Sequence, residues 1–239
     1  MRHIPNFITS LNLGSGFISI IFIFNGDINT ASWLILAAMI FDFLDGFASR
    51  ALKAYSDLGK ELDSLADVVS FGVAPGLIIY HLLYAALSPD TKTAFCISGF
   101  TSLIFLIVPS IMPVCAALRL AKFNIDVTQT TSFKGLPTPA NSLAVISIVL
   151  GGYYSGSAFL ASFMASPISL IILSLSLSGL MVSRIPLLSL KFKSLKIKGN
   201  EGRYILIALC AVMISVFGIG SIPGIIPVYI IVSLLSLLF

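Results

Sequence analysis

Apolar stretches of about 20 residues recur along almost the whole chain, and they constrain its fold more than any other feature. A helix needs about 20 mostly apolar residues to cross the hydrocarbon core of a bilayer. Only 10% of the 239 residues are charged, whereas about a quarter are charged in a typical soluble protein. The sequence therefore predicts an all-α, polytopic membrane protein in which lipid replaces water around much of the surface.

Eight stretches are long enough to be spans, and nearly the whole chain is needed to form them. The predicted spans are 7–26, 30–52, 60–87, 94–121, 140–161, 165–188, 203–219 and 222–239. The last two are short and are separated by little more than GIGSIPG, so a re-entrant pair is the alternative there. No small-residue cleavage site follows the first apolar stretch, and we expect it to be a retained span rather than a signal peptide.

The basic residues predict the orientation of these spans. If the N-terminus is cytoplasmic, every Lys and Arg except Lys92 falls in a cytoplasmic segment, and the C-terminus is cytoplasmic as well. The longest of these segments is the basic linker 191–202, in which lysines alternate with apolar residues. We attribute the net charge of +4 to loops that face anionic lipid, not to binding of nucleic acid.

The acidic residues are concentrated in one place, since six of the ten lie between residues 42 and 67. Asp42 and Asp45 are three residues apart on the second predicted span, and Asp63 and Asp67 are four apart on the third. Each pair therefore occupies one face of its helix. The short turn ALKAYSD predicts that the two helices are antiparallel neighbours. We expect the four carboxylates to converge near the cytoplasmic ends of these spans.

Four carboxylates this close together require a counter-charge. A like-charged pair at 4 Å costs about 1 kcal/mol in water and several-fold more at lower dielectric. Oxygen ligands without nearby His or Cys favour hard cations such as Mg²⁺ or Mn²⁺, and two neighbouring metal ions suit phosphoryl-type displacement. Acids inside a membrane also occur in ion pathways and proton relays, so a cation- or proton-coupled transporter is the alternative from another class of protein.

Residues 42–67, DFLDGFASRALKAYSDLGKELDSLAD, resemble the signature of the CDP-alcohol phosphatidyltransferase family. That signature reads D-x-x-D-G-x-x-A-R, then eight residues, then G-x-x-x-D-x-x-x-D. Seven positions match in type and spacing, and they are Asp42, Asp45, Gly46, Arg50, Gly59, Asp63 and Asp67. Ser49 departs from the pattern, because it stands where the family has alanine.

Four further stretches are similar to the membrane-embedded phosphatidylserine synthases of that family. They are FGVAPG (71–76), CAALRLAKFN (115–124), FKGLPTPAN (133–141) and LMVSR (180–184). In those relatives the second stretch usually ends LARFN, so Lys122 replaces an arginine with a residue of like charge. The resemblance covers roughly residues 1–190, and the last two predicted spans, within 203–239, lie outside it.

The resemblance implies a reaction in which CDP-diacylglycerol and L-serine give phosphatidylserine and CMP, with a divalent metal required. It also implies a six-helix catalytic core over 1–190, a cavity facing the cytoplasm, a homodimer and a location in the bacterial inner membrane. Transfer to another alcohol, such as inositol phosphate or glycerol phosphate, or a reaction on an archaeal-type lipid, remains an alternative within the family.

The expected roles of individual residues follow from this resemblance. Asp42, Asp45, Asp63 and Asp67 are the expected ligands of two Mg²⁺ or Mn²⁺ ions, and Asp67 is also the expected general base. Asp42, Gly46, Ser49, Arg50 and Gly59 are expected to bind the CDP-lipid. The zwitterionic acceptor needs a cation for its carboxylate, and the candidates for this acceptor or for lipid phosphate are Arg119, Lys122 and Lys134.

Overall fold

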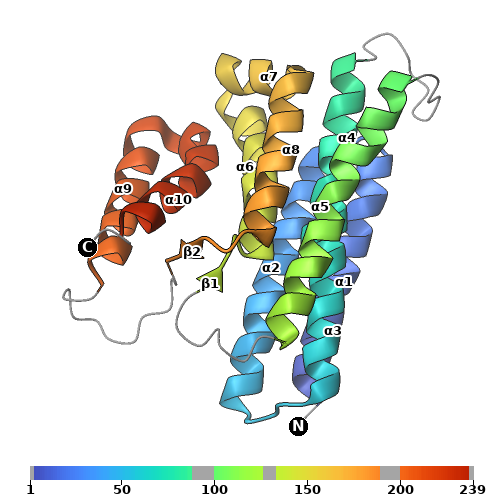
Figure 1. Cartoon of the computed structure of the whole chain (residues 1–239), viewed down its shortest axis with the longest axis vertical. Helices are drawn as coiled ribbons and strands as arrows, with labels where there is room; N and C mark the ends of the chain where they lie inside the picture. The colour runs from blue at the N-terminus through green and yellow to red at the C-terminus, as the bar shows by residue number, and fades with distance from the viewer. Residues whose placement is uncertain (1–2, 88–99, 126–132, 189–199, 237–239) are drawn as a thin grey trace.

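The computed structural model describes residues 3–87, 100–125, 133–188 and 200–236, which form a bundle of long helices with a helical hairpin at its side (Figure 1). In chain order the elements are α1 (His3–Phe24), α2 (Ile28–Ala51), α3 (Asp57–Val68), the π-helical segment η1 (Val69–Val73), α4 (Ala74–Leu87), α5 (Phe100–Ile125), β1 (Phe133–Lys134), α6 (Thr138–Ser155), α7 (Ala158–Ala165), α8 (Pro167–Val182), β2 (Pro186–Leu187), α9 (Glu201–Phe217), the 3-10 segment η2 (Gly218–Gly224) and α10 (Ile225–Leu235).

The predicted all-α membrane fold is confirmed. Within the described residues, five helical runs are long and apolar enough to cross a bilayer: α1, α2, the continuous run Asp57–Leu87, Phe105–Ile125 and Glu201–Leu235. The pair α7 and α8 adds a sixth if it is counted as one span, although the two helices are bent by 83° at their junction. The number of eight spans stays a prediction, and the protein is a multi-pass membrane protein.

Helix α6, which corresponds to the predicted span 140–161, is not among the five apolar runs because it carries several polar residues. It packs against η1, α2, α4, α7 and α8, and most of its length is buried. Neighbouring helices rather than lipid therefore surround much of α6. A helix in that position can carry buried polar residues such as Asn141, Ser142 and Ser147, provided that they find partners inside the protein.

The turn before α6 is tied to the end of α8. Strand β1 pairs antiparallel with β2, with Phe133 opposite Leu187. Next to this pair, the Gly135 amide donates to the Ile185 carbonyl at 2.9 Å, and the Leu136 amide donates to the Leu180 carbonyl at 2.9 Å. Gly135 has φ +79° and backbone carbonyls crowd the place of its missing Cβ, so the turn requires glycine here. The first residue of α6, Thr138, is fixed as a result.

Helices α2 and α3 run antiparallel, as the short turn between them predicts (Figure 1). They are not close packing neighbours, however, because α1 packs against both of them and is the main partner of α2. Ser56 caps α3 through a 3.0 Å hydrogen bond from the Gly59 amide, and the end of α5 holds the first turns of α3, where the Lys60 ammonium donates to the Asn124 carbonyl at 3.0 Å. The acidic motif is thus spread over two helices that face each other across one end of the bundle.

The C-terminal residues form a hairpin beside α6 (Figure 1). The two ends of the hairpin meet, because a Cβ added at Gly202 would lie 3.2 Å from the Ser236 Cβ. At 1.5 Å per residue α9 and α10 are about 25 Å and about 16 Å long, shorter than the hydrocarbon core of about 30 Å. Most of the predicted linker 191–202 and the last residues of the predicted span 222–239 lie outside the described residues.

Candidate active site

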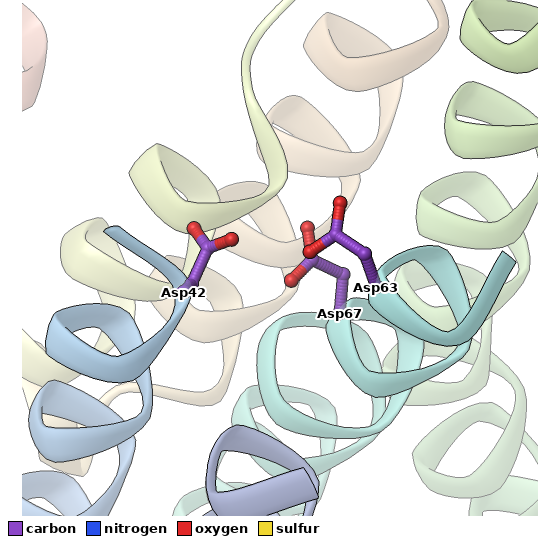
Figure 2. Close-up of side chains that lie close together, drawn as sticks. All are labelled: Asp42, Asp63 and Asp67. Atoms are coloured by element: carbon purple, nitrogen blue, oxygen red, sulfur yellow. The ribbon is translucent and has the colours of Figure 1, made fainter. Parts of the chain in front are cut away.

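Three of the four motif carboxylates come together between α2 and α3 (Figure 2). Asp42 projects from α2, and Asp63 and Asp67 project toward it from successive turns of α3. One carboxylate oxygen from each of the three lies within 4.8 Å of the others. The spacing of four residues between Asp63 and Asp67 puts both on the face of α3 that is turned toward α2.

The chemistry of this donor set fits a divalent cation. Every potential ligand atom in the cluster is a carboxylate oxygen, the type that Mg²⁺ and Mn²⁺ prefer. Asp63 Oδ1 is buried and has no hydrogen-bond partner among the described residues, which leaves a desolvated anionic oxygen to be compensated. Asp42, Asp63 and Asp67 could therefore hold a metal ion at this position.

Asp45 lies beside this cluster but is not a member of the group of three. It is 6% exposed and accepts a hydrogen bond of 2.6 Å from the Thr9 hydroxyl of α1. Asp45 and Asp63 both line a cavity of about 200 Å³, so Asp45 borders that cavity from the α2 side. The side chain of Thr9 consequently fixes the fourth carboxylate at the junction between the cluster and the cavity.

The cavity is formed by the start of α1, the end of α2, the turn that follows and the start of α3. Three residues that the sequence assigns to CDP-lipid binding line it, and they are Gly46, Ser49 and Gly59. A Cβ at Gly59 would lie 2.9 Å from Asn6 Oδ1 and 3.0 Å from Ser56 Oγ, so a side chain there would force these groups into or away from the cavity. Arg50 is exposed and is not part of the lining, although its guanidinium lies near Gly46.

On the opposite side of the cluster, Asp67 contacts buried polar residues from two other helices, and a third helix is linked to it through one of them. Asn12 Nδ2 of α1 donates to Asp67 Oδ1 at 3.3 Å, and the Thr138 hydroxyl of α6 donates to Asp67 Oδ2 at 3.5 Å. Arg119 Nη1 of α5 donates to the same Thr138 oxygen at 3.4 Å. Thr138 thus links the guanidinium to the carboxylate, and Asp67, which is 6% exposed, is held on both of its oxygens.

The three basic residues predicted for the acceptor are not in equivalent places. Arg119 is 9% exposed and points into the bundle, where it interacts electrostatically with Asp67, and its Nε has no partner among the described residues. Lys122, one turn further along α5, is exposed. The side chain of Lys134 lies outside the part of the chain that the structure describes. Of the two residues whose side chains the structure describes, Arg119 is the one that it brings to Asp67.

Comparison with known proteins places this geometry in a family. The model of the CDP-alcohol phosphatidyltransferase family matches residues 2–177, which include the whole acidic motif and the helices that hold it. The chain belongs to this family. The family uses divalent metals, in agreement with the carboxylate cluster.

Curated relatives of this family that align with most of the chain carry names that refer to serine. Archaetidylserine synthase of Methanothermobacter thermautotrophicus is 35% identical over 173 residues, which cover 72% of the chain and 67% of that protein. CDP-diacylglycerol–serine O-phosphatidyltransferase of Bacillus subtilis is 35% identical over 185 residues, which cover 77% of the chain and 89% of that protein. The protein of the same name from Saccharomyces cerevisiae is 38% identical over 168 residues, covering 64% of the chain and 54% of that protein.

The family motif does not include several side chains that hold its aspartates. Thr9 and Asn12 contact Asp45 and Asp67 from α1, and Thr138 contacts Asp67 from α6. The sequence carries a signal for the first two, because the buried positions of α1 are spaced by three or four residues and most of them are small or polar. These positions are Pro5, Thr9, Asn12, Gly16, Ser19 and Ile23.

Tyr229 of α10, beyond the region matched by the family, also approaches this site. It is buried, its hydroxyl donates to the Leu188 carbonyl at 3.0 Å, and it interacts electrostatically with Arg119. No motif or spacing in the sequence indicates this role, since α10 reads as an apolar segment.

Proposed function

We propose that this member of the family transfers the phosphatidyl group from CDP-diacylglycerol to L-serine and releases CMP. The observation that carries the proposal is the cluster of Asp42, Asp63 and Asp67 beside a cavity lined by motif residues, in a chain whose curated relatives are named for serine transfer. In the reaction the serine hydroxyl oxygen forms a bond to the phosphatidyl phosphorus, the bond from that phosphorus to CMP breaks, and the hydroxyl proton leaves with a base.

Asp42, Asp45, Asp63 and Asp67 are the residues that would hold two divalent cations, Mg²⁺ or Mn²⁺. Bound cations supply charge neutralisation for the pyrophosphate and for the departing CMP. The positions of the four acids support two ions that share ligands, because three acids are grouped together and Asp45 lies at the edge of the cavity. Thr9 keeps Asp45 oriented toward that edge through its short hydrogen bond.

The nucleotide end of the CDP-lipid would enter the cavity between α1, α2 and α3. Gly46 and Gly59 leave room for close approach of a ligand to the backbone, and Ser49 adds a hydroxyl to the wall. Arg50 is exposed at the end of α2 and is suited to contact the nucleotide phosphate from outside the cavity. Asp42 completes this set as a member of the carboxylate cluster, whose Asp63 lines the cavity.

Asp67 would accept the serine proton. Asn12 and Thr138 hold its two oxygens in place, so the carboxylate is oriented before the substrate arrives. Arg119 is the buried cation nearest to this carboxylate in the described chain and would bind the serine carboxylate through its unpaired Nε. Lys122 and Lys134 would attract the acceptor or the lipid phosphate from the membrane surface.

The proposal also includes the setting of the reaction. The end of α2, the start of α3 and the end of α5 lie toward one end of the bundle (Figure 1). Lys53, Lys60 and Lys122 belong to these segments. The positive-inside rule then gives a site and both chain termini on the cytoplasmic side of a bacterial inner membrane. A homodimer is expected from the family resemblance.

The test is CMP release by the purified protein in detergent with CDP-diacylglycerol and Mn²⁺ or Mg²⁺, with and without L-serine. Serine-dependent release supports the proposal. Release that responds instead to inositol phosphate or glycerol phosphate would keep the family and change the acceptor. Absence of release with every alcohol, together with cation flux in proteoliposomes that lack a CDP-lipid, would favour a transporter.

A second lipid donor is favoured by one specific observation. One archaeal relative is named for the synthesis of archaetidylserine, whereas the bacterial and yeast relatives are named for a diacylglycerol donor. The names share serine and differ in the lipid. A parallel assay with CDP-archaeol measures this choice, and a higher kcat/KM for CDP-archaeol than for CDP-diacylglycerol would assign the ether lipid.

A further inference from the structure

The helix that carries Asp63 and Asp67 changes its winding immediately after Asp67. The π-helical segment η1 spans Val69–Val73, and α4 continues from it without a break. Pro75 lies four residues after Phe71 and has no backbone N–H, so the Phe71 carbonyl has no donor at the usual position of an α-helix. The Phe71 carbonyl therefore lacks its usual α-helical donor and, in its buried place, accepts hydrogen bonds from outside its own helix.

Two side chains at the start of α6 supply the missing donors. Asn141 Nδ2 donates to the Phe71 carbonyl at 3.1 Å, and the Ser142 hydroxyl donates to the same oxygen at 3.1 Å. Both residues are fully buried, as is Phe71. A stretch about 70 residues away in the sequence thus replaces the hydrogen bond that Pro75 cannot make.

Helix α1 holds the same segment from the other side. The Ser70 hydroxyl donates to the Asn12 carbonyl at 3.1 Å, and the Asn12 side chain donates to Asp67. Gly16 makes this approach possible, because a Cβ there would lie 2.2 Å from Ser70 Oγ. The π-helical segment and the carboxylate beside it are therefore connected to α1 and α6 by buried hydrogen bonds.

The winding of η1 decides which way Asp67 faces. A π-helical turn accommodates one residue more than an α-helical turn, and one residue corresponds to about 100° of rotation about the helix axis. If this segment wound as an α-helix, α3 would turn by about that angle relative to α4. The apolar face of α4 and the acidic face of α3 could then not both keep their present partners.

We propose that Asn141 and Ser142 are positioning residues, and this proposal rests on the reaction proposed above. The two side chains hold η1 in its π-helical winding and so direct Asp67 at the carboxylate cluster. They act on the Phe71 carbonyl and not on the substrate. Single-turn π-helical segments are often found at functional sites. Here the segment lets the acidic face of α3 and the apolar face of α4 both keep their partners.

The experiment compares Asn141→Ala, Ser142→Ala and the double variant that carries both substitutions with the wild type. Each of these variants is also made with Pro75→Ala added. Three quantities are measured in detergent: kcat and KM for serine-dependent CMP release, Mn²⁺ affinity by electron paramagnetic resonance, and the thermal unfolding midpoint. Ser147→Ala is the matched control, because this buried serine of α6 donates only within its own helix, to the Ala144 carbonyl. Mn²⁺ binding tests the proposal even if the chain releases no CMP.

We expect the double variant to lose roughly 10- to 100-fold in kcat and in Mn²⁺ affinity, the range found when groups that orient metal ligands are removed. The substitution Pro75→Ala supplies a backbone N–H to the Phe71 carbonyl, so adding it raises the unfolding midpoint. It leaves kcat and Mn²⁺ affinity low, because the restored α-helical winding turns Asp67 away from the cluster.

Two results overturn the proposal. In the first, Pro75→Ala restores the midpoint, kcat and Mn²⁺ affinity together, so Asn141 and Ser142 serve only to satisfy a carbonyl. In the second, the double variant keeps the kcat and Mn²⁺ affinity of Ser147→Ala. If the double variant does not fold, Ser142→Ala gives the same comparison with a smaller effect, because the bond from Asn141 remains.

Discussion

The helix bundle and the first helix of the C-terminal hairpin place polar residues in opposite ways. In the bundle, Asn12, Asp67, Thr138 and Asn141 are buried and bonded to one another or to backbone carbonyls across helices. In the hairpin, α9 is apolar along most of its surface and its one buried residue is Leu206. Lipid accepts an apolar side chain anywhere along a helix, whereas a polar one at the same depth needs a partner. The buried polar contacts of this protein are therefore the better guide to its function.

The largest effect is expected at Asp67. Asp67→Asn keeps the shape of the side chain but removes the base and a potential metal ligand, and kcat for CMP release should fall by roughly 1000-fold or more. The assay is CMP release at saturating serine, with the unfolding midpoint as a check of folding. A variant that keeps a tenth of the wild-type rate would show that another group accepts the proton.

The second largest effect is expected for Asp63→Asn, which should lower the Mn²⁺ affinity roughly 100-fold because it removes one carboxylate from the cluster. Metal titration by electron paramagnetic resonance measures this affinity. Asp57→Asn is the matched control, since Asp57 is an exposed acid in the first turn of the same helix. Equal metal affinities in the two variants would show that Asp63 is not a metal ligand.

Arg119→Ala should raise the KM for serine by roughly 10- to 100-fold, which corresponds to the loss of one hydrogen bond to a charged group. Its measurement is the serine dependence of CMP release at fixed CDP-lipid. Arg184→Ala provides the comparison, because Arg184 is an exposed arginine beyond the end of α8. An unchanged KM in Arg119→Ala would move the acceptor carboxylate to another cation.

Tyr229→Phe probes the contact that joins the two regions. Removing the hydroxyl deletes its hydrogen bond to the Leu188 carbonyl and takes a polar group from the surroundings of Arg119, and we expect kcat/KM for serine to fall by roughly 2- to 10-fold. If the loss exceeds that of Arg119→Ala, the hairpin is a direct part of the acceptor site, and the contrast between the two regions fails.

The smallest effect is expected on the outer face of the hairpin. Val212 is 58% exposed on α9, so Val212→Ala removes contacts with lipid and hardly any with protein. The rate of CMP release and the unfolding midpoint should both stay within error of the wild type. A clear loss of activity would reveal a protein partner on this face.

The sequence predicts most of the bundle, because long apolar stretches are a strong signal and the membrane allows few folds. It also predicts that Asp42, Asp63 and Asp67 converge, since their spacing follows the helical period. It does not predict that α1, rather than α3, packs against most of α2, because helix packing depends on side-chain shape and not on apolarity. Nor does it predict that Arg119 is buried and Lys122 exposed, since both are basic residues near the end of the same predicted span.

The contacts of Tyr229 and of the Phe71 carbonyl are the hardest to predict from the sequence. Tyr229 meets Leu188, about 40 residues away, and Asn141 meets Phe71, about 70 residues away. Neither pair belongs to a periodic pattern, and the apolar context of each residue suggests packing alone. Pro75 gives a partial signal, because it removes a donor that the chain must replace.

The polar composition of α6 has a consequence for how the protein enters the membrane during synthesis. A helix with Thr138, Asn141, Ser142 and Ser147 partitions into lipid less readily than its apolar neighbours, because each polar group loses its water. Its partners on α3, η1 and α5 precede it in the chain and emerge from the ribosome first. The groups that pair with its polar side chains are therefore already synthesised when α6 reaches the membrane, and the same hydrogen bonds are available to biogenesis and to the active site.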